Sequence, residues 1–84
     1  MLWVRLGDGD NYNPFDDLSD VAAYLSENGV EQVERHTRYG VRSAAFKGNN
    51  YISLYWGDNH AQPSRDVTAG EIAELNSELR KVHA

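Results

Sequence analysis

The segment from Val41 to Trp56 constrains the fold of this 84-residue chain more than any other part of its sequence. Two runs with strand-like alternation flank Gly48-Asn49, and a glycine in the first central position is typical of the type II′ turn in a two-residue hairpin loop. The sequence therefore predicts a β-hairpin. Its expected pairs are Phe46 with Tyr51, Ala45 with Ile52, Arg42 with Tyr55 and Val41 with Trp56.

The predicted hairpin carries large side chains on both faces, because successive residues of a strand point to opposite sides of a sheet. One face holds Ile52, Leu54 and Trp56, which suit a hydrophobic core. The other face needs a cover, a ligand or a partner, and the first strand of the chain would add to it. We expect this second face to consist of Trp3, Arg5, Arg42, Phe46, Tyr51 and Tyr55.

The composition of the second face favours a protein partner, because Trp, Tyr and Arg dominate the energetics of protein interfaces. A second copy of the chain would serve in the same way and give a homodimer. Alternatively, the second helix covers this face and its aromatic side chains belong to the core. Bases of single-stranded nucleic acid could also stack there, but the net charge of −5 makes nucleic acid an unexpected partner.

Periodicity predicts two helices and two further strands outside the hairpin. Alternating apolar residues indicate a strand over Leu2–Leu6. Apolar residues at three- and four-residue spacing predict a helix with Pro14 in its first turn and an end at Asn28-Gly29. A weaker strand is expected from Val30 to Thr37. Thr68-Ala69-Gly70-Glu71 is a capping box, and the apolar stripe after it predicts the second helix.

The resulting order, β-α-β-β-β-α, predicts an α+β fold. We expect a single domain over residues 1–84, with two amphipathic helices packed on a four-stranded mixed sheet. The sheet is expected to be mixed because a β-α-β crossover makes the first two strands parallel.

Composition narrows the setting of the protein. The chain has no cysteine, which excludes a disulfide scaffold and a thiolate metal site. Its beginning lacks the features of a signal peptide, and no segment reaches the roughly 20 apolar residues of a membrane span. We therefore expect a cytoplasmic protein that does not contact a membrane. No cofactor-binding motif is recognisable, and none is expected.

The acidic residues are concentrated in the first part of the chain. Residues 7–29 carry six acidic side chains and no lysine or arginine. The first helix would present Asp16, Asp17 and Asp20. Such a surface can steer a basic partner toward the protein, so we expect these three residues to take part in partner binding.

A different hypothesis places a site at one edge of the sheet. If the first two strands are parallel, the loops after the first, second and last strands emerge on the same side. These loops carry Asp8, Asp10, Asp58 and His60. Carboxylates and a histidine are the groups that a metal-binding or acid–base site requires, so a small enzyme or metal-binding domain is the main alternative.

The sequence as a whole favours a non-enzymatic protein-binding domain of the inhibitor or adaptor type. It would act through the aromatic sheet face, the acidic helix or both. Its size and charge are also those of small inhibitors that phages and other mobile elements encode, which is an analogy of class rather than of family.

Overall fold

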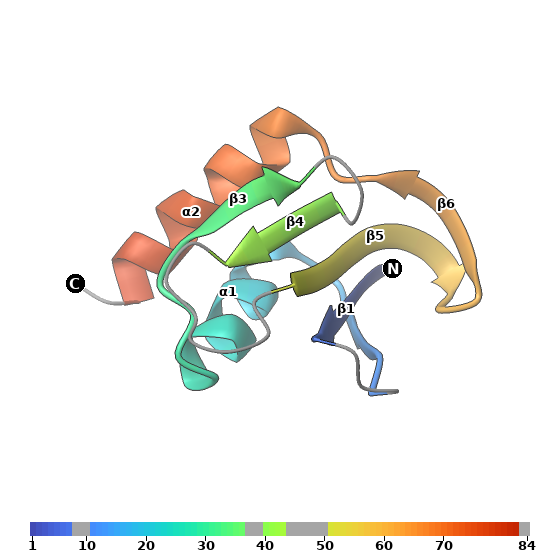
Figure 1. Cartoon of the computed structure of the whole chain (residues 1–84), viewed down its shortest axis with the longest axis horizontal. Helices are drawn as coiled ribbons and strands as arrows, with labels where there is room; N and C mark the ends of the chain where they lie inside the picture. Colours follow the sequence, from blue (N-terminus) through green and yellow to red (C-terminus); the bar gives the residue numbers. More distant parts are fainter. Residues whose placement is uncertain (8–10, 37–39, 44–50, 83–84) are drawn as a thin grey trace.

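The computed structural model describes residues 1–7, 11–36, 40–43 and 51–82, and it shows an α+β fold with two helices (Figure 1). The elements are β1 (Leu2–Leu6), β2 (Asn13–Phe15), α1 (Leu18–Glu27), β3 (Val33–His36), β4 (Gly40–Ser43), β5 (Tyr51–Asn59), β6 (Gln62–Asp66) and α2 (Ala69–Val82). The predicted fold class is therefore confirmed, whereas the arrangement of the strands differs from the expected one.

The sheet is built around β5, the longest strand. Its strand order is β2-β1-β5-β4-β3, and β6 also pairs with β5. Ile52 pairs with Leu6 of β1 on one edge of β5 and with Val41 of β4 on the other. Trp56 pairs with Leu2 of β1, and its second partner is Arg65 of β6. Strands β4 and β6 therefore follow one another along the same edge of β5.

The prediction of a mixed sheet is wrong, because every strand pair in the described residues is antiparallel. Strands β5 and β4 lie between β1 and β3, so β1 and β3 run in opposite directions. The crossover rule governs strands that are parallel, and here the chain passes from β1 through β2 and α1 to the far edge of the sheet.

The hairpin register is also corrected. Arg42 pairs with Tyr51 rather than with Tyr55, and Val41 pairs with Ile52 rather than with Trp56. The shift is four residues, an even number, so it leaves unchanged which β5 side chains face the core. The turn predicted at Gly48-Asn49, and the pairs expected for Ala45 and Phe46, lie outside the described residues.

The hydrophobic core lies between the helices and one face of the sheet (Figure 1). From the sheet it takes Leu2, Val4, Val33, Ile52 and Leu54, and from the helices it takes Leu18, Val21, Ala22, Leu25, Ile72, Leu75 and Leu79. Trp56 is half-buried against this core. The prediction that Ile52, Leu54 and Trp56 share the core face is thus confirmed.

Helix α1 begins later than the sequence suggests. The side chain of Asp17 accepts a hydrogen bond of 2.9 Å from the backbone N–H of Asp20 and so caps the helix. Pro14 lies in the edge strand β2 and not in a helical turn. An edge strand tolerates proline because its outer side needs no N–H donor.

Helix α2 forms as predicted. The Glu71 carboxylate accepts from the Thr68 N–H at 2.8 Å, and the Thr68 hydroxyl accepts from the Glu71 N–H at 3.1 Å, which completes the capping box. Ile72, Leu75 and Leu79 are buried, whereas Val82 is 49% exposed. Neither α1 nor α2, the helices of the described residues, is long and apolar enough to cross a membrane.

Candidate functional site

The second face of the sheet faces away from both helices. Trp3 pairs with Tyr55, and Arg5 pairs with Ser53, on the side opposite to the buried Leu2 and Val4. The alternative in which α2 covers this face is therefore not observed in the described part of the sheet. Trp3, Arg5 and Tyr55 are nevertheless only half-exposed, so other groups of the chain cover them in part.

The cover is the turn between β5 and β6. The His60 ring lies 5.9 Å from the Trp3 ring and 4.7 Å from the Tyr12 ring, measured between centroids. The Tyr55 hydroxyl donates to the His60 carbonyl, and the Trp3 indole N–H donates to the Gly57 carbonyl at 3.1 Å. The end of this hairpin thus folds back over the aromatic side chains of the sheet.

Gly57 makes this bend possible. The pairing of β5 with β6 shifts on both sides of Gly57, which is the signature of a bulge. A Cβ atom at this position would lie 2.6 Å from the backbone carbonyl oxygen of Gln62. The Gly57 N–H donates to the Met1 carbonyl at 3.0 Å. Only glycine fits where the two strands approach so closely.

The Arg5 side chain forms hydrogen bonds with other residues of the chain. Its two terminal nitrogens donate to the Tyr12 hydroxyl and to the Ser53 hydroxyl, each at 3.1 Å. Its guanidinium carbon lies 5.2 Å from the centroid of the Tyr12 ring. Burial and the neighbouring Tyr12 raise the pKa of Tyr55, and the positive charge of Arg5 partly offsets this effect. These contacts use two of the five N–H donors of Arg5, and its buried Nε has no hydrogen-bond partner among the described residues.

The six residues predicted for the second face are brought together only in part. Trp3, Arg5 and Tyr55 form one cluster with Tyr12 and His60. Arg42 and Tyr51 stand opposite one another in the ladder, but their side chains lie outside the described structure, as does all of Phe46. Sequence reasoning assigned His60 to the loop-edge site and did not expect Tyr12 or His60 on this face, because their place on it depends on β2 and on the bend at Gly57.

The parallel strands from which the loop-edge hypothesis was argued are not observed, whereas the site itself stays a prediction. Strands β1 and β5 are antiparallel neighbours, so the segments that follow them leave from opposite ends of the pair. Asp58 is exposed, and His60 packs on aromatic rings. Asp8 and Asp10 lie outside the described residues. Within residues 1–7, 11–36, 40–43 and 51–82, no group of three or more His, Cys, Asp or Glu side chains could hold a metal ion.

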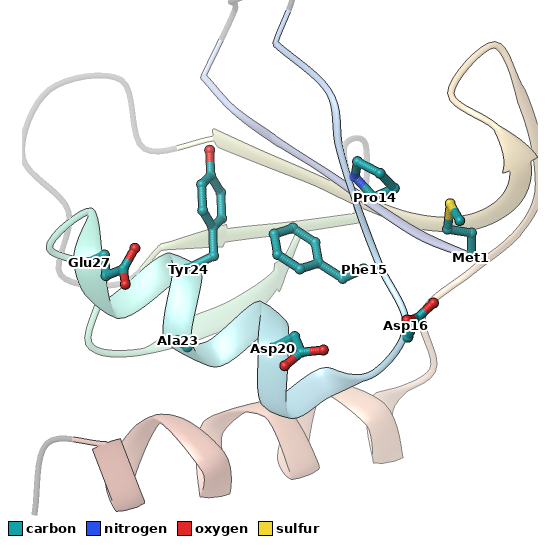
Figure 2. A pocket seen from close by; sticks show the side chains of 8 residues that line it. All are labelled: Met1, Pro14, Phe15, Asp16, Asp20, Ala23, Tyr24 and Glu27. Carbon is teal, nitrogen blue, oxygen red and sulfur yellow. The ribbon is translucent and has the colours of Figure 1, made fainter.

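The acidic side of α1 contains a hollow of about 460 Å³ between the helix and β2 (Figure 2). We call it the α1–β2 hollow. It is lined by Met1, Pro14, Phe15, Asp16, Asp20, Ala23, Tyr24 and Glu27. The rings of Phe15 and Tyr24 lie 5.3 Å apart between centroids and form its apolar wall. Asn13 donates to the Tyr24 hydroxyl at 3.1 Å, which fixes the ring against β2.

A second hollow, of about 400 Å³, lies between the start of α1 and α2. We call it the α1–α2 hollow. It is lined by Asp16, Asp17, Leu18, Ser19, Trp56, Glu71, Glu74 and Glu78. The two hollows share Asp16, and none of the described residues that line them is a lysine or an arginine. The sequence singled out Asp16, Asp17 and Asp20 as residues of the first helix, but Asp16 and Asp17 precede α1, and the sequence gave no sign of the carboxylates that α2 adds.

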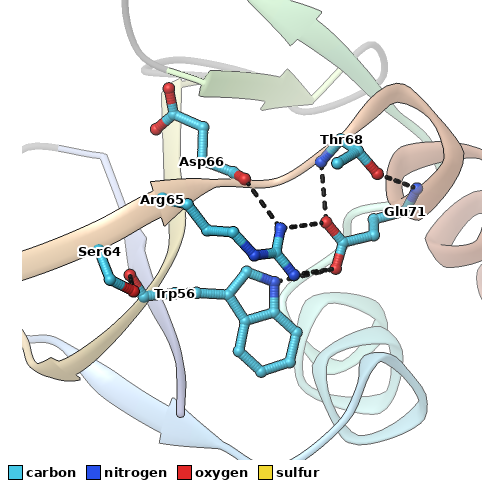
Figure 3. A network of polar contacts seen from close by, with 6 residues as sticks. All are labelled: Trp56, Ser64, Arg65, Asp66, Thr68 and Glu71. Atoms are coloured by element: carbon cyan, nitrogen blue, oxygen red, sulfur yellow. Dashed lines mark hydrogen bonds and ion pairs between the residues drawn. The ribbon is translucent and has the colours of Figure 1, made fainter.

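One wall of the α1–α2 hollow is held by a polar network (Figure 3). The Glu71 carboxylate accepts from the Trp56 indole N–H at 2.9 Å and from Arg65 at 2.8 Å. The Arg65 guanidinium carbon lies 5.2 Å from the Trp56 ring centroid. Hydrogen bonding to Arg65, followed by the backbone N–H of Thr68, lowers the pKa of Glu71 to about 2, although partial burial opposes this shift.

No family model matches the chain, and no curated protein or solved structure is significantly similar to it.

Proposed function

We propose that the protein is a non-enzymatic protein-binding domain of the inhibitor or adaptor type, and that it binds a basic partner with the acidic side of α1. The observation that carries this proposal is the pair of adjoining hollows around the start of α1. They combine apolar walls with a rim of carboxylates, and their lining in the described part of the chain includes no lysine or arginine.

The charges on this side are available to a partner. Asp16, Asp20 and Glu27 make no ion pair within the described part of the chain. An uncompensated acidic patch beside low-dielectric apolar groups raises the rate of encounter with a positively charged surface and disfavours acidic partners. Asp17 contributes its charge as well, although one of its oxygens caps the helix.

The aromatic sheet face supports partner binding less well. Trp3, Arg5 and Tyr55 are engaged by the β5–β6 turn and by Tyr12. A contact through Arg42, Phe46 and Tyr51, including contact between two copies of the chain, stays a prediction. The same engagement of the face makes it a poor platform for stacked bases.

Calorimetric titration with a pool of short Arg- and Lys-containing peptides tests the proposed function. Binding should weaken by about tenfold in a double variant that removes two charges, Asp16→Asn with Asp20→Asn. The matched control, Glu31→Gln with Asp58→Asn, removes two exposed charges elsewhere and should bind as the wild type does. Equal loss in both variants, or no binding to the wild type, would contradict the proposal.

A further inference from the structure

We infer that the α1–β2 hollow receives an apolar side chain from a helical segment of the partner, with two basic residues of that segment held by Asp20 and Glu27. This inference rests on the proposed function and specifies its binding mode.

The hollow has enough room and apolar lining to receive a large apolar side chain of a partner. Its volume of about 460 Å³ lies within the range of protein ligand sites. Phe15 and Tyr24 present ring surface to it, and Met1, which is 53% exposed, stands at its end. Figure 2 shows both rings between α1 and the strands, with acidic side chains on either side of them.

The spacing of the acidic residues suits a helix lying along α1. Asp20 and Glu27 are seven residues apart, which is about 10 Å along a helix axis. Ala23 and Tyr24 lie between them on the same stripe, at the three- and four-residue positions. A partner helix with basic residues seven positions apart and an apolar residue between them presents complementary charges at the same spacing.

The site is largely formed before a partner arrives. The Tyr24 ring is fixed by Asn13 and by its contact with Phe15. The carboxylates of Asp20 and Glu27 project from a regular helix and need not give up an internal ion pair within the described residues. Rigid walls and unpaired charges reduce the ordering and desolvation that binding would otherwise require.

The α1–α2 hollow is the weaker candidate for the same ligand. Glu71 is bound to Arg65 and to Trp56, and Glu78 pairs with Lys81 at 3.1 Å. A basic partner would have to displace these contacts. The indole of Trp56 is also held in place by its hydrogen bond and its contact with Arg65.

Two synthetic peptides of identical composition test the inference. Each is an alanine-based helix of about 18 residues, long enough to be partly helical in water, with two arginines seven positions apart. In the matched peptide two leucines lie between the arginines on the same face. In the control peptide the leucines lie on the opposite face. The matched peptide should bind about tenfold more tightly, because only its leucines can enter the hollow.

A pair of variants locates the binding. Ala23 is exposed and lines the hollow, so Ala23→Arg occupies it and offsets part of its negative charge while keeping a good helix former. This variant should lose the preference for the matched peptide. The control Ala73→Arg, on the exposed side of α2, should keep it.

The outcomes separate the two proposals. Equal binding of both peptides, with the same loss in Asp20→Asn and Glu27→Gln, overturns the inference but supports a basic partner. Tighter binding of the matched peptide that persists in Ala23→Arg also overturns the inference. Failure of both peptides overturns the inference, and the calorimetric titration with basic peptides then decides the proposed function.

Discussion

At the scale of single residues, Gly57 has a role that no side chain can replace. Its place in the bulge lets β5 bend. Its backbone N–H donates to the Met1 carbonyl, and its carbonyl accepts from the Trp3 indole N–H. The bend brings His60 over the sheet face and thereby decides how much aromatic surface a partner could reach.

We predict that Gly57→Ala destabilises the fold by about 2–4 kcal/mol, because the new methyl group would lie within 2.6 Å of a backbone oxygen and the strands would have to separate. Urea unfolding measures this cost. The matched control is Gly70→Ala: its methyl group would meet only the Thr68 hydroxyl, at 3.7 Å, and should change stability by less than about 1 kcal/mol. A change of similar size in the two variants would contradict the role given to Gly57.

The Glu71 carboxylate makes the stability of the folded protein depend on pH in the acidic range. Its pKa falls from the ordinary 4.5 to about 2 in the folded protein, so the folded state favours the charged form. The stabilisation is complete above pH 4.5 and is lost as the pH falls toward 2. Denaturant unfolding between these pH values should show a steeper loss of stability for the wild type than for Glu71→Gln. Parallel curves would show that the Arg65 contact does not favour the charged form.

At the scale of the elements, Asn76 joins α2 to the edge of the sheet. Its side-chain amide accepts from the Val33 N–H and donates to the Val33 carbonyl, both at 2.9 Å. These bonds satisfy backbone groups on the outer side of β3, where an open edge would invite pairing with another chain.

Asn76→Ala should therefore cost about 2–3 kcal/mol, since it leaves two backbone groups of a buried residue without partners. Hydrogen exchange of the Val33 amide should accelerate more than that of amides in β1. The exposed neighbour Glu74→Gln serves as the control. Unchanged exchange at Val33 in Asn76→Ala would show that the side chain does not hold this edge.

The elements that could be predicted are those with local signals. Helix α2 has a capping box and a regular apolar stripe, and both appear in the structure. The alternation of side chains in the hairpin predicted the core face of β5 correctly but not its pairing with β4. Sliding one strand past the other by any even number of residues leaves the same side chains on the core face, so alternation cannot distinguish these registers. Strand β6 was missed because all five of its residues, Gln62–Asp66, are exposed and no apolar alternation marks it.

The candidate site was predictable only in part, because only some of its residues have a local signal in the sequence. The acidic run identified Asp16, Asp17 and Asp20 without any tertiary information. The wall of the α1–β2 hollow depends on Phe15 in a strand meeting Tyr24 in a helix, and the sequence placed Phe15 inside the helix. A contact between two elements has no signature within either of them.

At the scale of the whole molecule, the sheet face and the α1 side differ in how much of each surface the chain itself covers. The β5–β6 turn covers part of the sheet face through contacts of His60 with Trp3 and Tyr12, whereas the α1–β2 hollow leaves apolar rings and the carboxylates of Asp20 and Glu27 open. If the proposed partner is basic, the net charge of −5 would add to its attraction over a longer range.

Binding should consequently be sensitive to salt. Raising the ionic strength from about 0.05 M to about 0.5 M shortens the screening length severalfold and should weaken the affinity for basic peptides by about tenfold or more. The comparison requires only calorimetry at the two concentrations. An affinity independent of salt would indicate that charge does not carry the interaction.

The most direct test of the central proposal is a map of backbone amide shifts in the labelled protein when the matched basic peptide is added. The account predicts the largest shifts at Asp16, Asp20, Ala23, Tyr24 and Glu27, with little change at Trp3 and Tyr55. Shifts concentrated at Trp3, Tyr55 and their sheet neighbours, with α1 unaffected, would contradict it.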